Sequence, residues 1–391
     1  MIEVETRKPI WAAGVMTGTS MDGLDVATVL TNGLSISSLW NHFKPVEFST
    51  EDRLVVQKAV TQARKSLDEP DGLYVDMHSR ESGEVFWDYF EDLYGVLDNS
   101  LAAVGFGTLP LEAIGVHGQT VAHAPDEGLT LQIFCPNRLM EIQEAPVVWD
   151  FRSEDVRAGG QGAPLAPFYH FALAKHIGAT EPVVFLNIGG VANITWVDPR
   201  KEFPEEPGAL MAFDTGPGNA LVNDWMFEKT KVLVMDVDGG AASTGRVHRD
   251  RLQTNWGKDY LRRPGPKSLD RNDFHGVLAA LEGLSINDGA ATLTQFTVDC
   301  VVESVRHMPS PPTRWLVCGG GRHNQTMMQM LQDRLDAPVE PVEAVGLDGD
   351  MLEAQAFAYL AVRVLRGLPT SAPSTTGCRE LVCGGRISYP T

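Results

Sequence analysis

The chain has 391 residues, of which 43% are hydrophobic and 21% charged, a composition typical of a globular protein with a sizeable core. Its 51 acidic residues outnumber its 32 basic ones and give a formal net charge of −19. A surface this acidic repels phosphate backbones and anionic lipids, so nucleic acids and membranes are poor partners. A phosphate ligand would therefore be held by backbone amides and a metal ion.

The sequence also points to one cellular compartment. No apolar run approaches the 18 residues of a membrane-spanning helix, and the first ten residues lack the apolar segment of a secretory signal. Five cysteines are widely scattered and fit no common zinc or redox spacing: Cys135, Cys300, Cys318, Cys378 and Cys383. We therefore expect free thiols in a cytoplasmic protein.

In the first half of the chain, short apolar runs alternate with polar or amphipathic stretches, which predicts sheets covered by helices. Residues 11–16 form a strand that enters the polar turn Thr17–Gly23, after which a second strand follows. The capping box Ser49–Asp52 opens an amphipathic helix. The remaining expected elements are a helix at 82–97 and buried strands at 113–116 and 147–149, which end at His117-Gly-Gln-Thr120 and Asp150-Phe-Arg152.

The second half opens in the same way as the first. An apolar run at 182–186 enters the turn Asn187-Ile-Gly-Gly190 and continues as a strand at 191–196. Both halves thus begin with two strands joined by a turn of small and polar residues. The later elements are a loop at 262–271, a strand at 315–318 that ends in Gly319-Gly-Gly321, and a buried helix at 352–365.

Four glycine-rich turns follow predicted strands: Gly18–Gly23, Gly189-Gly190, Gly216–Gly218 and Gly319–Gly321. Glycine lets backbone N–H groups approach a phosphate closely, and strand ends are where ligands bind in open α/β sheets. A single such turn would be an ordinary tight turn, whereas four favour a ligand site. The chain lacks the Walker A and G-x-G-x-x-G patterns, so neither of those phosphate-binding motifs applies.

Seven motifs occur in order along the chain: Gly18-Thr-Ser-Met-Asp-Gly23, His117-Gly-Gln-Thr120, Asp150-Phe-Arg152, Gly159-Gly-Gln-Gly-Ala-Pro-Leu165, Asn187-Ile-Gly-Gly-Val-Ala-Asn193, Phe213-Asp-Thr-Gly-Pro-Gly-Asn219 and Cys318-Gly-Gly-Gly321. Together they resemble the motifs of the anhydro-N-acetylmuramic acid kinase family, to which the fungal levoglucosan kinases are related, and the resemblance spans residues from about 14 to 385. The resemblance implies an α/β protein with the two-lobed, actin-like ATPase fold, which is ribonuclease H-like and binds nucleotide in a cleft between its lobes. We expect one lobe to comprise residues 1–178 and 350–391, and the other residues 179–349.

The resemblance also implies roles for individual residues. Asp214 is the expected catalytic base, which activates a water and also contacts the sugar. ATP would be bound by Gly18, Thr19, Ser20, Met21, Asp22, Gly23, Gly189, Gly190, Gly216, Gly319, Gly320, Gly321 and Asn324. The sugar would be bound by His117, Gln119, Asp150, Arg152 and Asp155, and Mg²⁺ by Asp22 and Glu353.

The residues alone leave other interpretations open for four of these side chains. Asp22 also suits a turn cap, and Glu353 an acid that compensates a helix dipole. Arg152 could pair with Asp155 instead of a ligand carboxylate, and His117 could be a packed loop residue.

The implied activity is ATP- and Mg²⁺-dependent: 1,6-anhydro-N-acetylmuramic acid is opened with water and phosphorylated on O6, a step of peptidoglycan recycling. The family tends to form homodimers. The alternatives are a kinase for another anhydrosugar such as levoglucosan, or a nucleotide-gated binding protein of the actin or chaperone type. The chain departs from many relatives at Leu269-Asp270, where they have Thr-Gly.

Overall fold

The computed structural model describes residues 8–18, 23–40, 46–67, 110–134, 139–140, 144–252, 258–269 and 273–390. The helix predicted at 82–97 and the turn residues Thr19–Asp22 lie outside these ranges. The chain divides into two compact units. Unit 1 contains residues 1–169, 353–372 and 378–391, and unit 2 contains residues 170–352 and 373–377.

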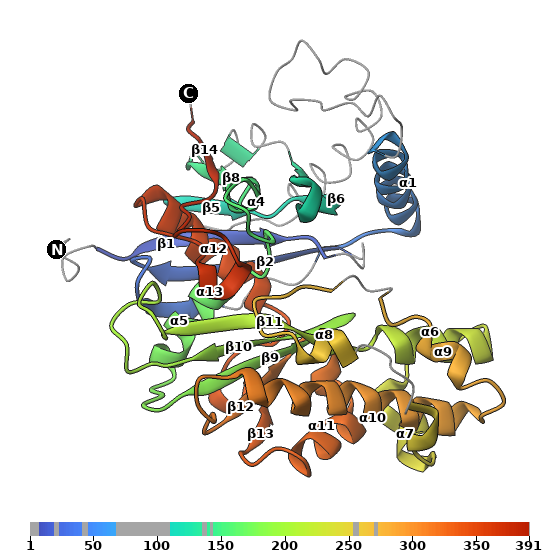
Figure 1. Ribbon diagram of the computed structural model, residues 1–391. Coiled ribbons are helices and arrows are strands. Elements are labelled where there is room, and N and C mark those ends of the chain that lie inside the picture. Colours follow the sequence, from blue (N-terminus) through green and yellow to red (C-terminus); the bar gives the residue numbers. More distant parts are fainter. Residues whose placement is uncertain are drawn as a thin grey trace. The chain divides into compact units, whose positions relative to one another are not determined.

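Unit 1 is built around a sheet with the strand order β14-β8-β5-β1-β2-β3, in which β4 also pairs with β2 (Figure 1). The strands of unit 1 are β1 (Ile10–Met16), β2 (Gly23–Thr31), β3 (Ile36–Trp40), β4 (Val46–Glu47), β5 (Ala113–Val116), β6 (Gln119–Ala124), β7 (Leu129–Ile133), β8 (Val147–Trp149) and β14 (Arg386–Ser388), of which β6 and β7 pair only with each other. Its helices are α1 (Thr50–Leu67), α4 (Ser153–Arg157) and α12 (Leu352–Leu365), and α5 (Pro167–His176) spans the boundary between the units. The strands predicted from apolar runs are confirmed.

Unit 2 is built around a sheet with the strand order β11-β10-β9-β12-β13. Its strands are β9 (Val183–Ile188), β10 (Val191–Val197), β11 (Leu210–Pro217), β12 (Trp315–Cys318) and β13 (Val339–Pro341). Its α-helices are α6 (Ala220–Thr230), α7 (Gly240–Thr244), α8 (Lys258–Arg262), α9 (Val277–Ala280), α10 (Ile286–Ser304), α11 (Gln325–Gln332) and α13 (Pro373–Thr376). Buried side chains of α10 and α11 pack on this sheet, and Figure 1 shows the two helices beside its strands.

The two sheets share one topology. In unit 1, β1, β2 and β3 form an antiparallel meander, and β5 and β8 add in parallel on the other side of β1. In unit 2, β9, β10 and β11 form the meander, and β12 and β13 add in parallel on the other side of β9. This duplicated α/β arrangement is the actin-like architecture that the resemblance implied, and each hairpin predicted from the sequence begins one of the two meanders.

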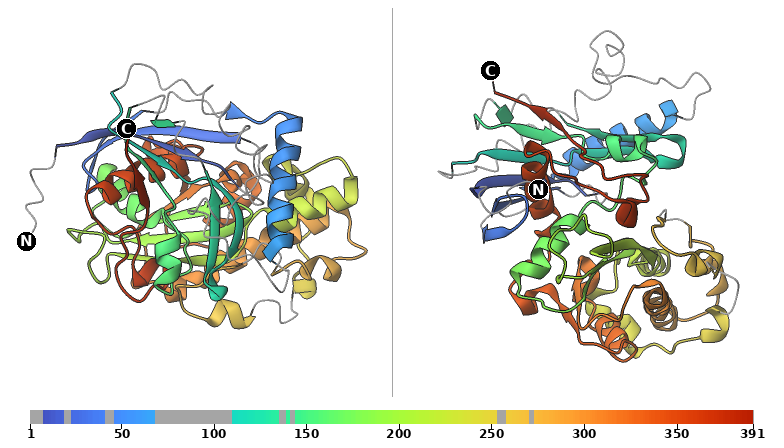
Figure 2. Two further views of the ribbon diagram at one scale, coloured as in Figure 1. Left: turned by 90° about the horizontal axis from the view of Figure 1, so that it is seen from above. Right: turned by 60° about the vertical axis from the view of Figure 1, so that its left-hand side comes forward.

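Two glycines allow α12 to lie close to the sheet of unit 1, where the views of Figure 2 show it crossing the strands. Gly14 of β1 and Gly115 of β5 are register partners. A Cβ atom on Gly14 would lie 1.8 Å from the carbonyl oxygen of Ala354, and one on Gly115 would lie 2.1 Å from that of Phe357. Any larger residue would push the helix away, so these glycines fix the position of α12 and of Glu353 in its first turn.

None of the helices in the described part of the chain combines the length and apolar character needed to cross a bilayer. Within the described residues no disulfide involves Cys300, Cys318, Cys378 or Cys383, while Cys135 lies outside those residues.

Candidate active site

In unit 1 the parallel strands β1 and β5 end side by side, which brings two of the predicted motifs together. The Thr17 hydroxyl, at the end of β1, donates a hydrogen bond to the carbonyl of Gly118 over 2.8 Å. Gly18 follows Thr17. At Gly23, where β2 begins, an added Cβ atom would lie 2.3 Å from the carbonyl oxygen of Val46. The edge of the sheet thus places Thr17, which precedes the first glycine turn, beside His117-Gly118. The roles of Thr19, Ser20, Met21 and Asp22 stay predictions.

Arg152 is the centre of a buried polar cluster in unit 1. Its Nε–H and Nη2–H donate to Nε2 of His117 over 3.0 and 2.8 Å, and its Nη1–H donates to the carbonyl of Gly162 over 2.7 Å. Burial lowers the pKa of Arg152 to about 10, while the charges of Glu353 and Asp155 raise it. Three of the five guanidinium N–H groups are therefore used, and two are left for a ligand such as a carboxylate.

His117 accepts from this guanidinium and is therefore neutral. Burial, together with the charge of Arg152, lowers the pKa of His117 well below its ordinary value. Because Nε2 is the acceptor, the ring proton is on Nδ1, which is buried and has no partner in hydrogen-bonding geometry among the described residues. The ring also packs on Phe357 with the centroids 4.8 Å apart.

Asp155 is completely buried, and both carboxylate oxygens already accept hydrogen bonds from the protein. Oδ2 accepts from the backbone N–H of Gly162 over 2.7 Å, and Oδ1 accepts from the hydroxyl of Ser371. A Cβ atom on Gly160 would lie 2.2 Å from Oδ2, so the glycine motif wraps directly around this carboxylate. These contacts make Asp155 a support for the loop that Arg152 also holds, while a direct bond from Asp155 to a sugar stays a prediction.

Asp150 and Gln119 lie at the ends of strands in unit 1, where the sequence predicted them. Asp150 follows β8 with a φ of 54°, and its carboxylate pairs with Arg386 over 2.9 Å and accepts the Ser153 hydroxyl. Gln119 begins β6 and is 1% exposed, yet its Oε1 accepts no hydrogen bond from the described residues. A buried acceptor without a partner is costly in a protein alone, so Gln119 suits a ligand hydroxyl.

Glu353 lies in the first turn of α12 and makes no hydrogen bond or ion pair to any residue that the structure describes. Although its side chain reaches solvent, the surrounding protein raises the pKa of its carboxyl group, against the charge of Arg152. Carboxylate oxygens of this kind are the ligands that Mg²⁺ prefers, so Glu353 fits the predicted metal. Within the described ranges there is no group of three His, Cys, Asp or Glu side chains that could hold an ion, and Asp22 lies outside them.

In unit 2, Asp214 is held at three points by the segment 260–269. Its backbone N–H donates to the carbonyl of Lys267 over 3.0 Å, and its own carbonyl accepts the Tyr260 hydroxyl over 2.7 Å. Its Oδ2 accepts the backbone N–H of Leu269 over 2.8 Å, and Oδ1 has no hydrogen-bond partner among the described residues. Burial raises the pKa of Asp214 to about 7, although the Leu269 N–H and the charge of Lys267 lower it. A carboxylate with a free oxygen and such a pKa suits a general base.

The turn after β9 is fixed by the end of β11 and the start of α6. The backbone N–H groups of Gly218 and Asn219 donate to the carbonyls of Gly190 and Gly189 over 2.9 and 2.7 Å. Cβ atoms on Gly189 and Gly190 would meet nothing closer than 3.6 Å, so this turn has an open side that a phosphate could approach. Gly216 is different, because a Cβ there would lie 2.6 Å from that of Cys300 in α10.

The third glycine turn of unit 2 follows β12. Gly319 has a φ of 71°, and a Cβ there would lie 2.2 Å from Oδ1 of Asn187, while one on Gly321 would lie 2.4 Å from the Ile188 side chain. Packing within the protein therefore explains these two glycines without a ligand, whereas Gly320 has no neighbour within 3.8 Å. Asn324 caps α11 by accepting the N–H of Met327 over 2.9 Å.

Two side chains of this region, Tyr260 and Lys267, were not predicted, because they lie in or beside the stretch 262–271 that the sequence predicts to be a polar loop. Their partner Asp214 is 46 residues from Tyr260, so no local pattern could reveal the contact. The one signal was a lysine between proline and serine inside an otherwise arginine-rich stretch.

Comparisons with known proteins show which family this chain resembles along its length. The family model described as anhydro-N-acetylmuramic acid kinase matches residues 11–390. The curated anhydro-N-acetylmuramic acid kinase of Ruegeria sp. (strain TM1040) is 48% identical over 98% of this chain and 96% of its own length. That of Roseobacter denitrificans is 48% identical over 98% and 95%, and that of Cereibacter sphaeroides is 47% identical over 97% and 96%. The chain therefore belongs to the anhydro-N-acetylmuramic acid kinase family.

Proposed function

We propose that the protein uses ATP to open 1,6-anhydro-N-acetylmuramic acid with water and to phosphorylate its O6, which gives N-acetylmuramic acid 6-phosphate and ADP in peptidoglycan recycling. The observation that carries this proposal is Asp214, a carboxylate with a pKa of about 7 and one unpartnered oxygen. Family membership supplies the substrate, because the curated relatives are named for it.

The chemistry assigns one proton transfer to Asp214. Its carboxylate takes a proton from a water whose oxygen bonds to the anomeric carbon, and the bond from that carbon to O6 breaks. The released O6 attacks the γ-phosphorus of ATP, and the bond from that phosphorus to the β,γ-bridging oxygen breaks. The sugar gains one water and one phosphoryl group, and one proton is released in all.

Asp22 and Glu353 would hold Mg²⁺, which supplies positive charge against the phosphate oxygens when it is bound. Support for this comes from the Glu353 carboxylate, which has no hydrogen-bond or ion-pair partner within the described ranges and lies at the start of α12. The chain's own contribution is to fix that helix through the close approach at Gly14 and Gly115.

For the sugar, we propose that the two unused N–H groups of Arg152 bind the lactyl carboxylate. His117, Gln119 and Asp150 would contact hydroxyl or acetamido groups, and Asp155 would act mainly by holding the loop behind Arg152. For ATP, the phosphates would lie on Gly18–Gly23, Gly189, Gly190 and Gly216, and the adenosine on Gly319–Gly321 and Asn324.

A pair of glycine substitutions separates packing from nucleotide binding in the turn after β12. Gly320→Ala is expected to leave the unfolding free energy within about 0.5 kcal/mol and to raise the KM for ATP, because its Cβ enters open space. Gly319→Ala is expected to lower the unfolding free energy by about 1–3 kcal/mol, because of its positive φ and its contact with Asn187. Denaturant titration and ATP kinetics measure both. An unchanged KM for ATP in Gly320→Ala would remove this turn from the adenosine site.

Mass spectrometry after mixing the protein with MgATP and 1,6-anhydro-N-acetylmuramic acid tests the reaction itself. The expected product is heavier than the sugar by one phosphoryl group and one water. ATP loss without a sugar product would favour a nucleotide-gated binding protein instead. No product from this sugar, but one from levoglucosan, would assign another anhydrosugar as substrate.

Two further features are proposed from the family resemblance, a cytoplasmic location and a homodimeric state. Light scattering at assay concentration measures the second, and a mass equal to that of one chain would contradict it.

A further inference from the structure

Lys267 is a buried lysine whose side chain links two parts of the segment 260–269, the segment that contacts Asp214. It is 7% exposed, and its Nζ donates to the backbone carbonyls of Tyr260 and Arg263 over 2.9 and 2.8 Å. The ammonium group also lies over two aromatic rings, 4.4 Å from the centroid of Tyr260 and 5.4 Å from that of Phe213. The side chain thus ties the end of α8 to residue 267, across the loop that contains Arg263.

The same segment makes all three contacts to Asp214 described above. The Lys267 carbonyl, the Tyr260 hydroxyl and the Leu269 N–H each bind a different part of that residue. If the Lys267 side chain released its two carbonyls, these three groups would no longer be held in one arrangement.

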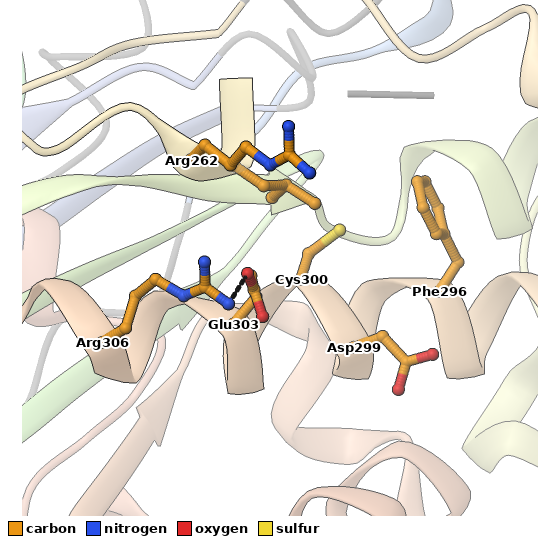
Figure 3. A pocket seen from close by; sticks show the side chains of 7 residues that line it. Arg262, Phe296, Asp299, Cys300, Glu303 and Arg306 are labelled. Atoms are coloured by element: carbon orange, nitrogen blue, oxygen red, sulfur yellow. Dashed lines mark ion pairs between the residues drawn. The ribbon is translucent and has the colours of Figure 1, made fainter. Parts of the chain in front are cut away.

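Several charged or titratable groups act on Lys267. Arg263, on the same segment, lowers its pKa, whereas Asp214 of β11 and Cys300 and Glu303 of α10 raise it. Burial is the largest effect, and the pKa is lowered to about 8, so Lys267 is mostly charged at neutral pH. Cys300 and Glu303 also line a pocket of about 340 Å³ with Leu261 and Arg262, in which Glu303 pairs with Arg306 (Figure 3).

We infer that Lys267 is a positioning residue for Asp214: its two hydrogen bonds hold the segment 260–269 on Asp214, and its positive charge favours the ionised carboxylate. The inference rests on the proposed function of Asp214 as the base. Lys267 does not touch the reacting atoms in this arrangement. It acts through the Leu269 N–H, which occupies Oδ2 and leaves Oδ1 to the water.

Two substitutions divide the effect of charge from that of the hydrogen bonds. Lys267→Gln keeps two N–H donors for the carbonyls and removes the charge, whereas Lys267→Met removes both. Without the charge, the pKa of Asp214 rises by about one unit, so the acid limb of kcat/KM moves to higher pH. We expect a loss of roughly tenfold at pH 6 in Lys267→Gln, with near wild-type values at pH 9, where Lys267 of the wild type has lost its proton.

Lys267→Met is expected to show the same shift and a lower kcat at every pH. Lys229→Met is the matched control, because Lys229 also lies 4.4 Å from an aromatic centroid, that of Trp225. Among the described residues, it forms no hydrogen bond or ion pair with the segment 260–269. An acid limb unchanged in Lys267→Gln would overturn the inference, whether or not stability changes. If Lys267→Met does not fold, the Gln variant alone decides.

A second readout does not need activity. The difference in unfolding free energy between the wild type and Asp214→Asn changes with pH as Asp214 ionises. When both proteins also carry Lys267→Gln, this difference should keep changing up to a pH about one unit higher. If the wild type fails to phosphorylate the sugar, the proposed function is wrong, yet this measurement still tests the coupling. An unmoved stability profile would contradict the inference even in a fully active kinase.

Discussion

Replacing Asp214 by Asn is expected to lower kcat by about 10²- to 10⁴-fold, because an amide of the same shape cannot accept the proton of the attacking water. Nucleotide binding should persist, since the side chain does not belong to the glycine turns. The hydrogen bond from Leu269 can be kept by the amide oxygen, so the local structure is preserved. Kinetics with the anhydrosugar and an equilibrium titration with ATP measure the two properties separately.

The same variant should also change how stability depends on pH. With a pKa of about 7 in the folded protein and about 3.9 unfolded, Asp214 is protonated when folded and ionised when unfolded between these values. The wild type therefore loses unfolding free energy as the pH rises from 4 to 7, by about 2–4 kcal/mol for this partly buried group. Asp214→Asn lacks this loss. Near wild-type kcat, or a difference in stability that does not vary with pH, would remove Asp214 as the base.

Replacing Arg152 by Lys is expected to lower kcat/KM for 1,6-anhydro-N-acetylmuramic acid by roughly 10- to 100-fold, the value of a lost bidentate, charge-assisted contact. A lysine has one ammonium group and cannot serve His117, Gly162 and a ligand carboxylate together. For 1,6-anhydro-N-acetylglucosamine, which lacks the lactyl carboxylate, the loss should be below about threefold. The comparison of the two sugars isolates the carboxylate contact from any general disturbance.

Arg157→Lys is the control, because Arg157 lies five residues further on and pairs with Glu154 at the surface. It should leave both sugars unaffected. Equal losses for the two sugars in Arg152→Lys would mean that Arg152 only supports His117 and the loop, the structural alternative that the sequence left open.

Local patterns predicted the parts of this molecule that depend on short stretches of chain. Apolar runs bounded by glycine and polar residues were enough to place β1, β5, β9, β10 and β12 and the turns after them. The capping box at Ser49 and Asp52 is present, with the reciprocal hydrogen bonds that define it.

The remainder depends on contacts between distant residues, which a single sequence does not reveal. The resemblance implied that Asp155 binds the sugar, which stays a prediction. No local pattern revealed that its oxygens accept hydrogen bonds from Gly162 and from Ser371, 216 residues further along the chain. Gly319 and Gly321 were predicted to make room for adenosine, and the protein's own Asn187 and Ile188 already require glycine there. Packing within the protein therefore requires glycine at both positions, whether or not adenosine binds there.

The close contact of α12 with Gly14 and Gly115 has a consequence for biosynthesis. Unit 1 contains residues from both ends of the chain, and its sheet needs a helix that the ribosome makes only after residue 352. The N-terminal part of unit 1 must therefore wait, with one face of β1 and β5 uncovered, while nearly all of unit 2 is synthesised. Nascent chains of this protein should accordingly engage chaperones through their earliest segment until the last 40 or so residues emerge.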